Sequence, residues 1–225
     1  MNDVDWLVCT EPGPMVAFLC RRGWGSDRKL RLFACACARH IWRLLRTDAT
    51  RRAVEASEGY ADGLVSKKAL AQARLAAQDG SKGSRTLADW QRADPAGWTA
   101  WCAARESMGS AAVDTAHMAS CAATMGMGGA SDGATRAELA DLLRDVVGDP
   151  FRPVSFDPAW ARAGDGTAAR LALACYEERD FTRLPILADA LEEAGCADPA
   201  VLGHCRGPGP HVRGCWVIDL VLGRS

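Results

Sequence analysis

The sequence predicts an all-α protein, folded as an irregular multi-helix bundle. Three observations support this prediction. Apolar residues recur at helical spacing in several segments, helix-start and helix-stop residues flank those segments, and strand-like alternation is nearly absent. Of the 225 residues, 48% are hydrophobic and 24% are charged, which is ordinary for a globular protein and argues against disorder.

The clearest helix begins after Ser26 and Asp27, which are residue types that cap helix N-termini. Its apolar residues fall on one stripe about five turns long; they are Leu30, Phe33, Ala34, Cys37, Ile41, Leu44 and Leu45. A row of basic residues lies opposite this stripe: Arg28, Arg31, Arg39, Arg43 and Arg46. We therefore expect one side of this helix to face the core and the other to face solvent.

The remaining helices follow from the same signals. Thr135 and Glu138 form a capping-box pattern ahead of a leucine-rich segment, and Asp198 followed by Pro199 marks another helix start. The helical segments expected after the first one are 48–56, 66–78, 98–125, 135–147, 168–177, 184–194 and a short one from residue 198. The apolar segment 217–222 fits either a strand or a buried terminal helix.

The sequence indicates a single helical domain covering residues 1–225, with a candidate subdomain boundary near 127–134. Gly126, Gly128 and Gly129 follow a long helical segment there, and glycine commonly ends a helix. No internal repeat, heptad pattern or low-complexity tract is present beyond an alanine bias.

The chain contains ten cysteines. Its N-terminal residues are acidic, whereas a secretory signal would begin with basic and then apolar residues. No apolar run reaches the about 18 residues that span a bilayer. We therefore expect a cytoplasmic protein with reduced thiols and no membrane partner.

Charge and motif content bear on the class of function. The formal net charge is -1, which does not favour binding to nucleic acid. The sequence contains no G-x-S-x-G, H-E-x-x-H, P-loop or C-x-x-C motif. It therefore predicts no catalytic residue and no cofactor.

The C-terminal segment concentrates polar residues around a Gly-Pro-Gly-Pro turn. His204, Cys205, His211 and Cys215 have the spacing H-C-x5-H-x3-C and are residue types that bind zinc. Structural zinc sites usually use paired cysteines on tight turns, and this segment lacks such a pair. We therefore favour no metal here, with both cysteines in the core and both histidines capping backbone groups, and keep zinc as the alternative.

The same segment has a second interpretation as an anion-binding loop. Glycine amides beside arginine side chains complement a phosphate or a carboxylate. The residues of this candidate ligand site are Arg206, Gly207, Gly209, His211 and Arg213. The competing interpretation, which we favour, pairs the arginines with nearby acidic residues such as Glu192, Glu193 or Asp219.

Cys35 is the candidate reactive thiol. It lies one helical turn from Arg31 and one turn from Arg39, and neighbouring cations favour the thiolate form. Cys37 belongs to the apolar stripe, so we expect it to be inert. No base is evident beside Cys35, and a solvated basic helix face with an incidental cysteine is the simpler interpretation.

Three segments together carry a resemblance to other proteins: 26–37, 148–154, and 184–196 followed by the C-terminal sequence HCRGPGPHVRGCWV. The chain resembles an uncharacterised protein family of planctomycete bacteria of the Gemmata type, over nearly its whole length. The resemblance implies a bacterial, cytoplasmic protein. It implies no activity and no catalytic residue.

Helix-packing signals without a catalytic signature favour a non-enzymatic helical module that interacts with a protein partner. The alternative is a small-ligand or anion-binding protein, with or without catalysis, that uses the loop from Arg206 to Arg213. A deep polar pocket at that loop would favour the alternative, and a flat surface would favour the module.

Overall fold

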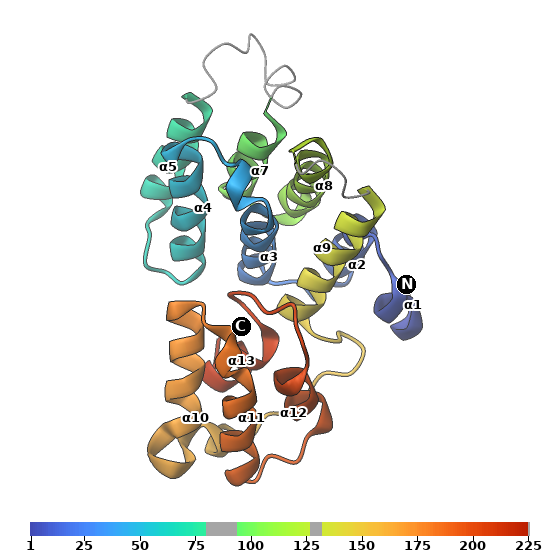
Figure 1. Cartoon of the computed structure of the whole chain (residues 1–225), viewed down its shortest axis with the longest axis vertical. Helices are drawn as coiled ribbons and strands as arrows, with labels where there is room; N and C mark the ends of the chain where they lie inside the picture. The colour runs from blue at the N-terminus through green and yellow to red at the C-terminus, as the bar shows by residue number, and fades with distance from the viewer. Residues whose placement is uncertain (80–93, 127–131, 225) are drawn as a thin grey trace. The chain divides into compact units, whose positions relative to one another are not determined.

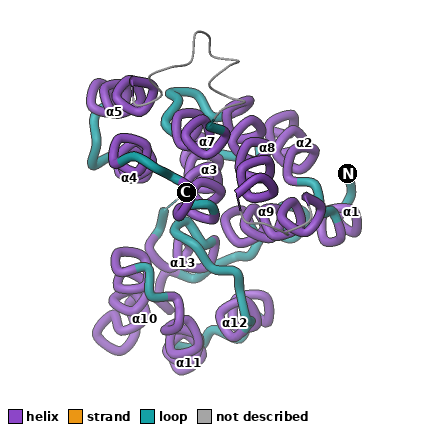
Figure 2. The backbone as a smooth tube through the Cα atoms, turned by 45° about the horizontal axis from the view of Figure 1, so that its top comes forward, coloured by secondary structure: helices purple, strands orange, loops and turns teal. Residues whose placement is uncertain are grey.

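The computed structural model describes residues 1–79, 94–126 and 132–224 (Figure 1). These residues form helices joined by turns and loops, and none of them belongs to a strand (Figure 2). The predicted all-α, multi-helix class is therefore confirmed. None of the described helices is both long enough and apolar enough to cross a membrane.

The chain divides into two compact units, Met1–Leu143 and Arg144–Ser225. The division falls within α9 (Asp132–Val147), after the 127–134 segment where the sequence suggested a boundary. Residues 127–131 of that segment, including Gly128 and Gly129, lie outside the described residues. Glycine content indicates where a helix ends, but the contacts that define a unit are made by side chains distant in sequence.

Helix α3 (Asp27–His40) is the central helix of the N-terminal unit, and α4, α7 and α8 all pack against it. Helix α2 also packs against α8, and α5 packs against α4. The other helices of this unit are α1 (Asp3–Val8), α2 (Pro12–Arg22), the 3-10 helix η1 (Trp42–Leu44), α4 (Asp48–Ala61), α5 (Lys67–Asp79), α7 (Pro95–Ala103) and α8 (Gly109–Gly126).

Because neighbours pack around α3, its central stretch has no solvent face. Every residue from Leu30 to Ala38 is buried, including Arg31. Arg39 pairs with Glu58 of α4 at 2.6 and 2.8 Å, and its guanidinium lies 4.3 Å from the Trp42 ring. The expectation of a solvated basic face is therefore wrong for this stretch, since periodicity within one helix does not show which neighbours cover its polar side.

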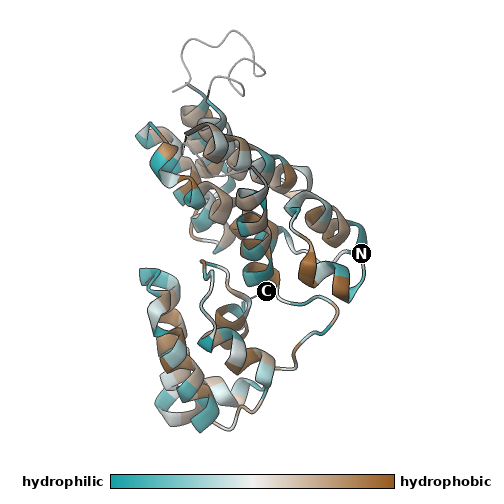
Figure 3. Cartoon of the chain, turned by 45° about the vertical axis from the view of Figure 1, so that its right-hand side comes forward, coloured by the Kyte–Doolittle hydropathy of each residue, from teal (hydrophilic) through white to brown (hydrophobic). Residues whose placement is uncertain are grey.

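The C-terminal unit consists of helices packed around an apolar core of their own. Its helices are α10 (Pro158–Glu178), the 3-10 helix η2 (Phe181–Arg183), α11 (Leu184–Glu193), α12 (Pro199–Arg206) and α13 (Trp216–Leu222). Helix α10 packs against α11 and α13, and α11 packs against α12. Hydrophobic and hydrophilic residues share these helices (Figure 3), and buried apolar residues from all four α-helices form one cluster.

The terminal apolar segment is a helix, not a strand. Cys215 precedes its first turn, and Gly223 ends it with a φ of 65°. Val217, Ile218 and Val221 are buried at helical spacing, whereas Trp216 is half-buried. This helix fixes the far end of the loop that contains the histidines.

Candidate metal centre

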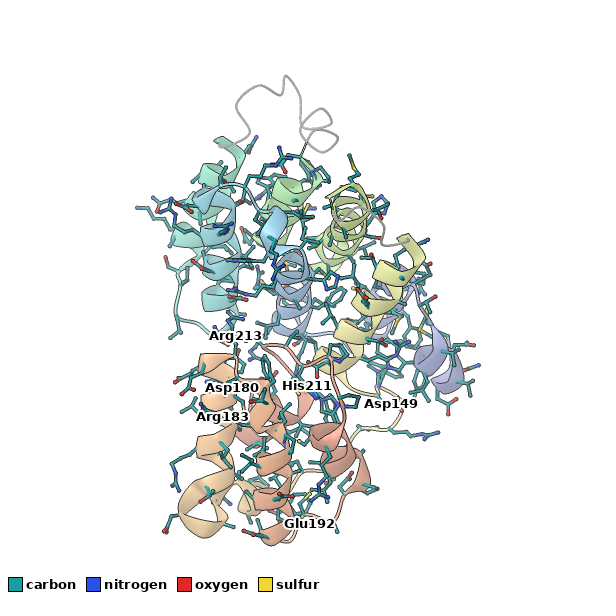
Figure 4. All side chains as sticks on the ribbon, in the orientation of Figure 1. Asp149, Asp180, Arg183, Glu192, His211 and Arg213 are labelled. Carbon is teal, nitrogen blue, oxygen red and sulfur yellow. The ribbon has the colours of Figure 1, made fainter. Side chains whose placement is uncertain are left out.

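Four side chains of the C-terminal unit bring electron-pair donor atoms together: Asp145, His204, His211 and Cys215. One such atom from each side chain lies within 4.8 Å of the others. Asp145 belongs to the last turn of α9, His204 to α12, His211 to the following loop, and Cys215 to the start of α13. Figure 4 labels His211 among the side chains of this unit.

Local sequence explains how the last three of these residues are placed. Asp198 accepts hydrogen bonds from the amides of Ala200 and Val201 at 2.8 and 3.2 Å, so α12 begins there. His204 therefore lies in the last turn of α12, which ends before Gly207. Residues 207–214 form a loop that returns the chain to Cys215, the N-cap residue of α13.

Asp145 is at the centre of the cluster, and its side chain is only 2% exposed. Its Oδ1 lies 3.0 Å from His211 Nδ1 and 3.1 Å from His204 Nε2, and its Oδ2 accepts a hydrogen bond from the Val212 amide at 2.8 Å. Burial alone would raise the pKa of Asp145, but the contacts with the two histidines outweigh it and lower the pKa. The carboxylate is therefore ionised at neutral pH.

The His211 ring is fixed through both of its nitrogens. Nδ1 faces Asp145, and Nε2 lies 3.3 Å from the carbonyl oxygen of Gly207. Burial alone would lower the pKa of His211, but the hydrogen bond and charge of Asp145 raise it above its usual value. A proton on Nε2, donated to the Gly207 carbonyl, leaves Nδ1 directed at the cluster.

His204 does not connect Cys215 and Asp145 in a proton relay. A catalytic relay places the nucleophile and the carboxylate on opposite nitrogens of the imidazole. Here His204 Nε2 lies 3.2 Å from Cys215 Sγ and 3.1 Å from Asp145 Oδ1, so a single nitrogen faces both. Cys215 is also fully buried, which raises the pKa of its thiol well above the usual value. The geometry does not make Cys215 an activated nucleophile.

The four donor atoms fit one small cation instead. Ligand atoms around tetrahedral zinc lie about 3.3 to 3.6 Å apart, given bond lengths of about 2.0 to 2.3 Å. The contacts of Asp145 Oδ1 and His204 Nε2 described above span 3.0 to 3.2 Å, and all four donor atoms lie within 4.8 Å of one another, so shifts of about 1 Å would bring them to the spacing of zinc ligands. Carboxylate oxygen, imidazole nitrogen and thiolate sulfur are all zinc ligands.

Three of the four residues in the H-C-x5-H-x3-C pattern thus come together, and the fourth does not. Cys205 is fully buried in the apolar core of the unit. Burial raises the pKa of Cys205 to about 12. Its place in the donor set is taken by Asp145, which the sequence interpretation did not include.

The candidate anion loop does not converge on a ligand. Arg206 pairs with Asp189 at 2.8 Å and with Glu192 at 2.5 Å. Arg213 lies 4.6 Å from the Tyr176 ring, which Arg224 also approaches at 4.2 Å. Figure 4 shows Arg213 and Glu192 at opposite ends of the unit. The two loop arginines therefore point to different partners. His211 belongs to the metal cluster instead, and Gly207 contacts it through its carbonyl oxygen.

Arg206→Ala should leave the thermal unfolding midpoint and the metal affinity nearly unchanged. Both acidic partners of Arg206 are more than half exposed, and exposed ion pairs contribute little to stability. Calorimetry and metal titration of the variant would check this. A large loss of metal affinity would show that the ion pairs fix the end of α12 and hence His204.

Cys35, the candidate reactive thiol, does not lie on a solvated helix face. Its side chain is 1% exposed, and its Sγ lies 3.8 Å from the carbonyl oxygen of Val54 in α4. Burial, together with the charge of Glu58, raises the pKa of Cys35 to about 12 despite the nearby arginines. A buried, protonated thiol is unreactive, so the interpretation of Cys35 as the reactive cysteine is corrected.

Thiol labelling of the native protein should therefore modify Cys20 first and leave Cys35 unmodified until the protein unfolds. All ten cysteines are free, and Cys20 is the one with an exposed side chain. Peptide mass spectrometry after timed iodoacetamide treatment would measure each rate. Equal rates at Cys20 and Cys35 would contradict the burial of α3.

Sequence analysis missed Asp145, although one signal was present. Arg144 and Asp145 lie between Leu142–Leu143 and Val146–Val147, so Asp145 is an acidic residue with apolar residues on both sides in the same helix. Buried acids are uncommon unless they are paired or bind a metal. That signal points to a special role for Asp145, but not to its partners in the C-terminal loop.

Comparisons with protein-family models, with curated proteins and with solved structures give no match to this chain. A proposal for the function therefore rests on the geometry of the cluster.

Proposed function

We propose that this chain is a zinc-binding helical protein in which Asp145, His204, His211 and Cys215 hold the ion. The observation that carries the proposal is the convergence of four ligand atoms within 4.8 Å of one another in one unit. Three of them come from within the last 22 residues, and the fourth comes from the end of α9. The ion would therefore link α9, α12 and α13.

Charge supports a divalent ion. An ionised Asp145, a Cys215 thiolate and two neutral imidazoles carry two negative charges, which a divalent cation neutralises. Burying a neutral assembly costs far less than burying an unpaired charge. The Asp145 side chain is 2% exposed, and Cys215 is fully buried. At such a buried site, a divalent cation that cancels both negative charges is favoured over a monovalent one.

Four protein ligands favour a structural role over a catalytic one. A catalytic zinc ion keeps a position for water or substrate, whereas a structural ion is enclosed by the protein. The site would thus act as a staple within a non-enzymatic helical module, and interaction with a protein partner is the role we propose for that module.

Metal analysis of the purified protein tests the zinc proposal. The protein should contain one equivalent of zinc, and Co²⁺ in its place should give intense visible bands of tetrahedral cobalt and a thiolate charge-transfer band. Cys215→Ser should abolish the charge-transfer band. Cys205→Ser is the matched control, because Cys205 is equally buried in the same unit but lies outside the donor set.

A second measurement separates the structural role from a catalytic one. Acetohydroxamate or cyanide added to the cobalt protein should leave the spectrum unchanged if the protein supplies all four ligands. A spectral change would show an open coordination position and overturn the non-enzymatic proposal. Absence of bound zinc together with absence of a cobalt spectrum would overturn metal binding itself.

A further inference from the structure

The rings of Trp216, His204 and His211 contact one another in that order through a tilted and an edge-on contact, and this row of rings is called the ring stack. The His204 ring lies between the Trp216 indole, at 5.1 Å between centroids, and the His211 imidazole, at 4.9 Å. The two imidazoles meet nearly at right angles, with an interplanar angle of 79°. His204 therefore contacts two rings, those of Trp216 and His211. His211 contacts the His204 ring and, through Nε2, the carbonyl oxygen of Gly207.

A glycine with a left-handed backbone lies at each end of this stack. At one end is Gly148, with a φ of 77°, where an added Cβ would lie 3.1 Å from Trp216 Cγ. At the other end is Gly209, with a φ of 92°, where an added Cβ would lie 3.1 Å from the His211 amide nitrogen and 3.3 Å from His211 Cδ2. Both positions thus disfavour a side chain for two reasons, backbone conformation and contact with the stack.

We propose that Gly148, Gly209 and Trp216 are positioning residues for the metal site. This inference rests on the proposed zinc binding. None of the three offers a side-chain ligand atom, but together they set the orientation of the rings that do. Gly209 allows the loop to close on His211, where the Gly207 carbonyl faces Nε2, and Gly148 gives Trp216 the space to pack beside His204.

The reason for such positioning is the geometry of the ion. Zinc ligands are oriented by outer groups, and loss of one such group typically lowers metal affinity about 10- to 100-fold. His204 has a side chain that is 20% exposed, so burial alone does not fix its ring. The stack with Trp216 supplies that restraint, and the loop supplies it for His211.

Glycine-to-alanine variants test the proposal, with Zn²⁺ and Co²⁺ as the probes. Gly209→Ala and Gly148→Ala should each weaken Zn²⁺ binding by about tenfold or more and shift the visible bands of the Co²⁺ protein. Gly223→Ala is the matched control, because this glycine of the same unit also has a positive φ, 65°, and an added Cβ there contacts nothing within 4 Å. It should bind both ions as the unmodified protein does.

Trp216 variants keep the proposal testable if the alanine variants fail to fold. Trp216→Leu leaves both glycines in place and should also weaken binding, while Trp216→Phe retains a ring and should recover most of the affinity. Circular dichroism would verify that each variant is folded. A merely structural role for these residues would change stability but leave the cobalt bands of the folded variants unshifted.

The outcomes separate this inference from the zinc proposal. If the unmodified protein binds neither ion, both proposals fail. If the unmodified protein binds zinc and folded Gly148, Gly209 and Trp216 variants bind it equally well, only the positioning role fails. Equal losses in the Gly223 control would also overturn it, because the effect would then come from backbone strain and not from the ring stack.

Discussion

Removal of zinc should lower the free energy of unfolding of the C-terminal unit by about 4 kcal/mol, relative to a sample with free zinc about a thousand-fold above its dissociation constant. The ligands come from three helices and a loop of that unit, so the unfolded chain cannot present them together. Calorimetry before and after treatment with a chelator would measure the loss, and added zinc should restore it.

Cys215→Ser and Cys205→Ser separate the effect of the ion from the effect of a core substitution. Each variant places a hydroxyl where a buried thiol was, and both sites are fully buried. Only the Cys205→Ser variant should still be stabilised by added zinc. If a chelator removes the zinc, as shown by elemental analysis, and the unfolding transition does not move, the ion is not the staple proposed for this unit.

The second large effect is expected in the N-terminal unit, at Arg31. This side chain is 1% exposed, donates hydrogen bonds to the carbonyl oxygens of Arg105 and Glu106 at 2.7 Å each, and pairs with Asp27 at 2.9 Å. Its guanidinium also lies 4.8 Å from the Tyr60 ring. Arg31→Met should cost about 3 kcal/mol, since it keeps much of the side-chain volume but removes the hydrogen bonds that the buried guanidinium donates to the two carbonyl oxygens.

Urea unfolding followed by circular dichroism would measure this cost. Arg52→Met is a suitable control, because Arg52 is an exposed arginine of α4 in the same unit. The control should change stability by about 0.5 kcal/mol or less, as expected for a surface substitution. Similar losses in the two variants would mean that Arg31 does not hold the segment between α7 and α8 in place.

The sequence was sufficient for many of the helices because their signals are local, but α1 and α2 were not predicted, and α7 and α8 were expected as one helix. The Asp198 cap, the stripe along α3 and the glycine that ends α13 each depend on residues within one or two turns. Local signals also limited the prediction for α3. Its arginines lie on one helix face, as spacing requires, but Glu58 of α4 and the carbonyls that follow α7 cover that face.

Only part of the candidate site could be predicted from the sequence, because sequence signals are local. His204, His211 and Cys215 lie close together in the chain, so their metal-binding chemistry could be recognised. Cys205 shared their spacing but points into the apolar core, and spacing alone does not distinguish the two cysteines. Asp145 joins the set only through the tertiary fold, because no local rule pairs the end of α9 with a loop in the C-terminal segment.

The separation of Asp145 and His211 in the chain, 66 positions, has a consequence for how the C-terminal unit unfolds. An ion held by both residues closes the intervening chain into a ring that contains α10, α11 and α12. Because the unfolded chain does not present the ligands together, this ring exists only in the folded unit and opens when the unit unfolds and releases the ion. All ten cysteines are free thiols, so zinc would give this unit a reversible cross-link without oxidation, one that opens when a stronger ligand takes the ion.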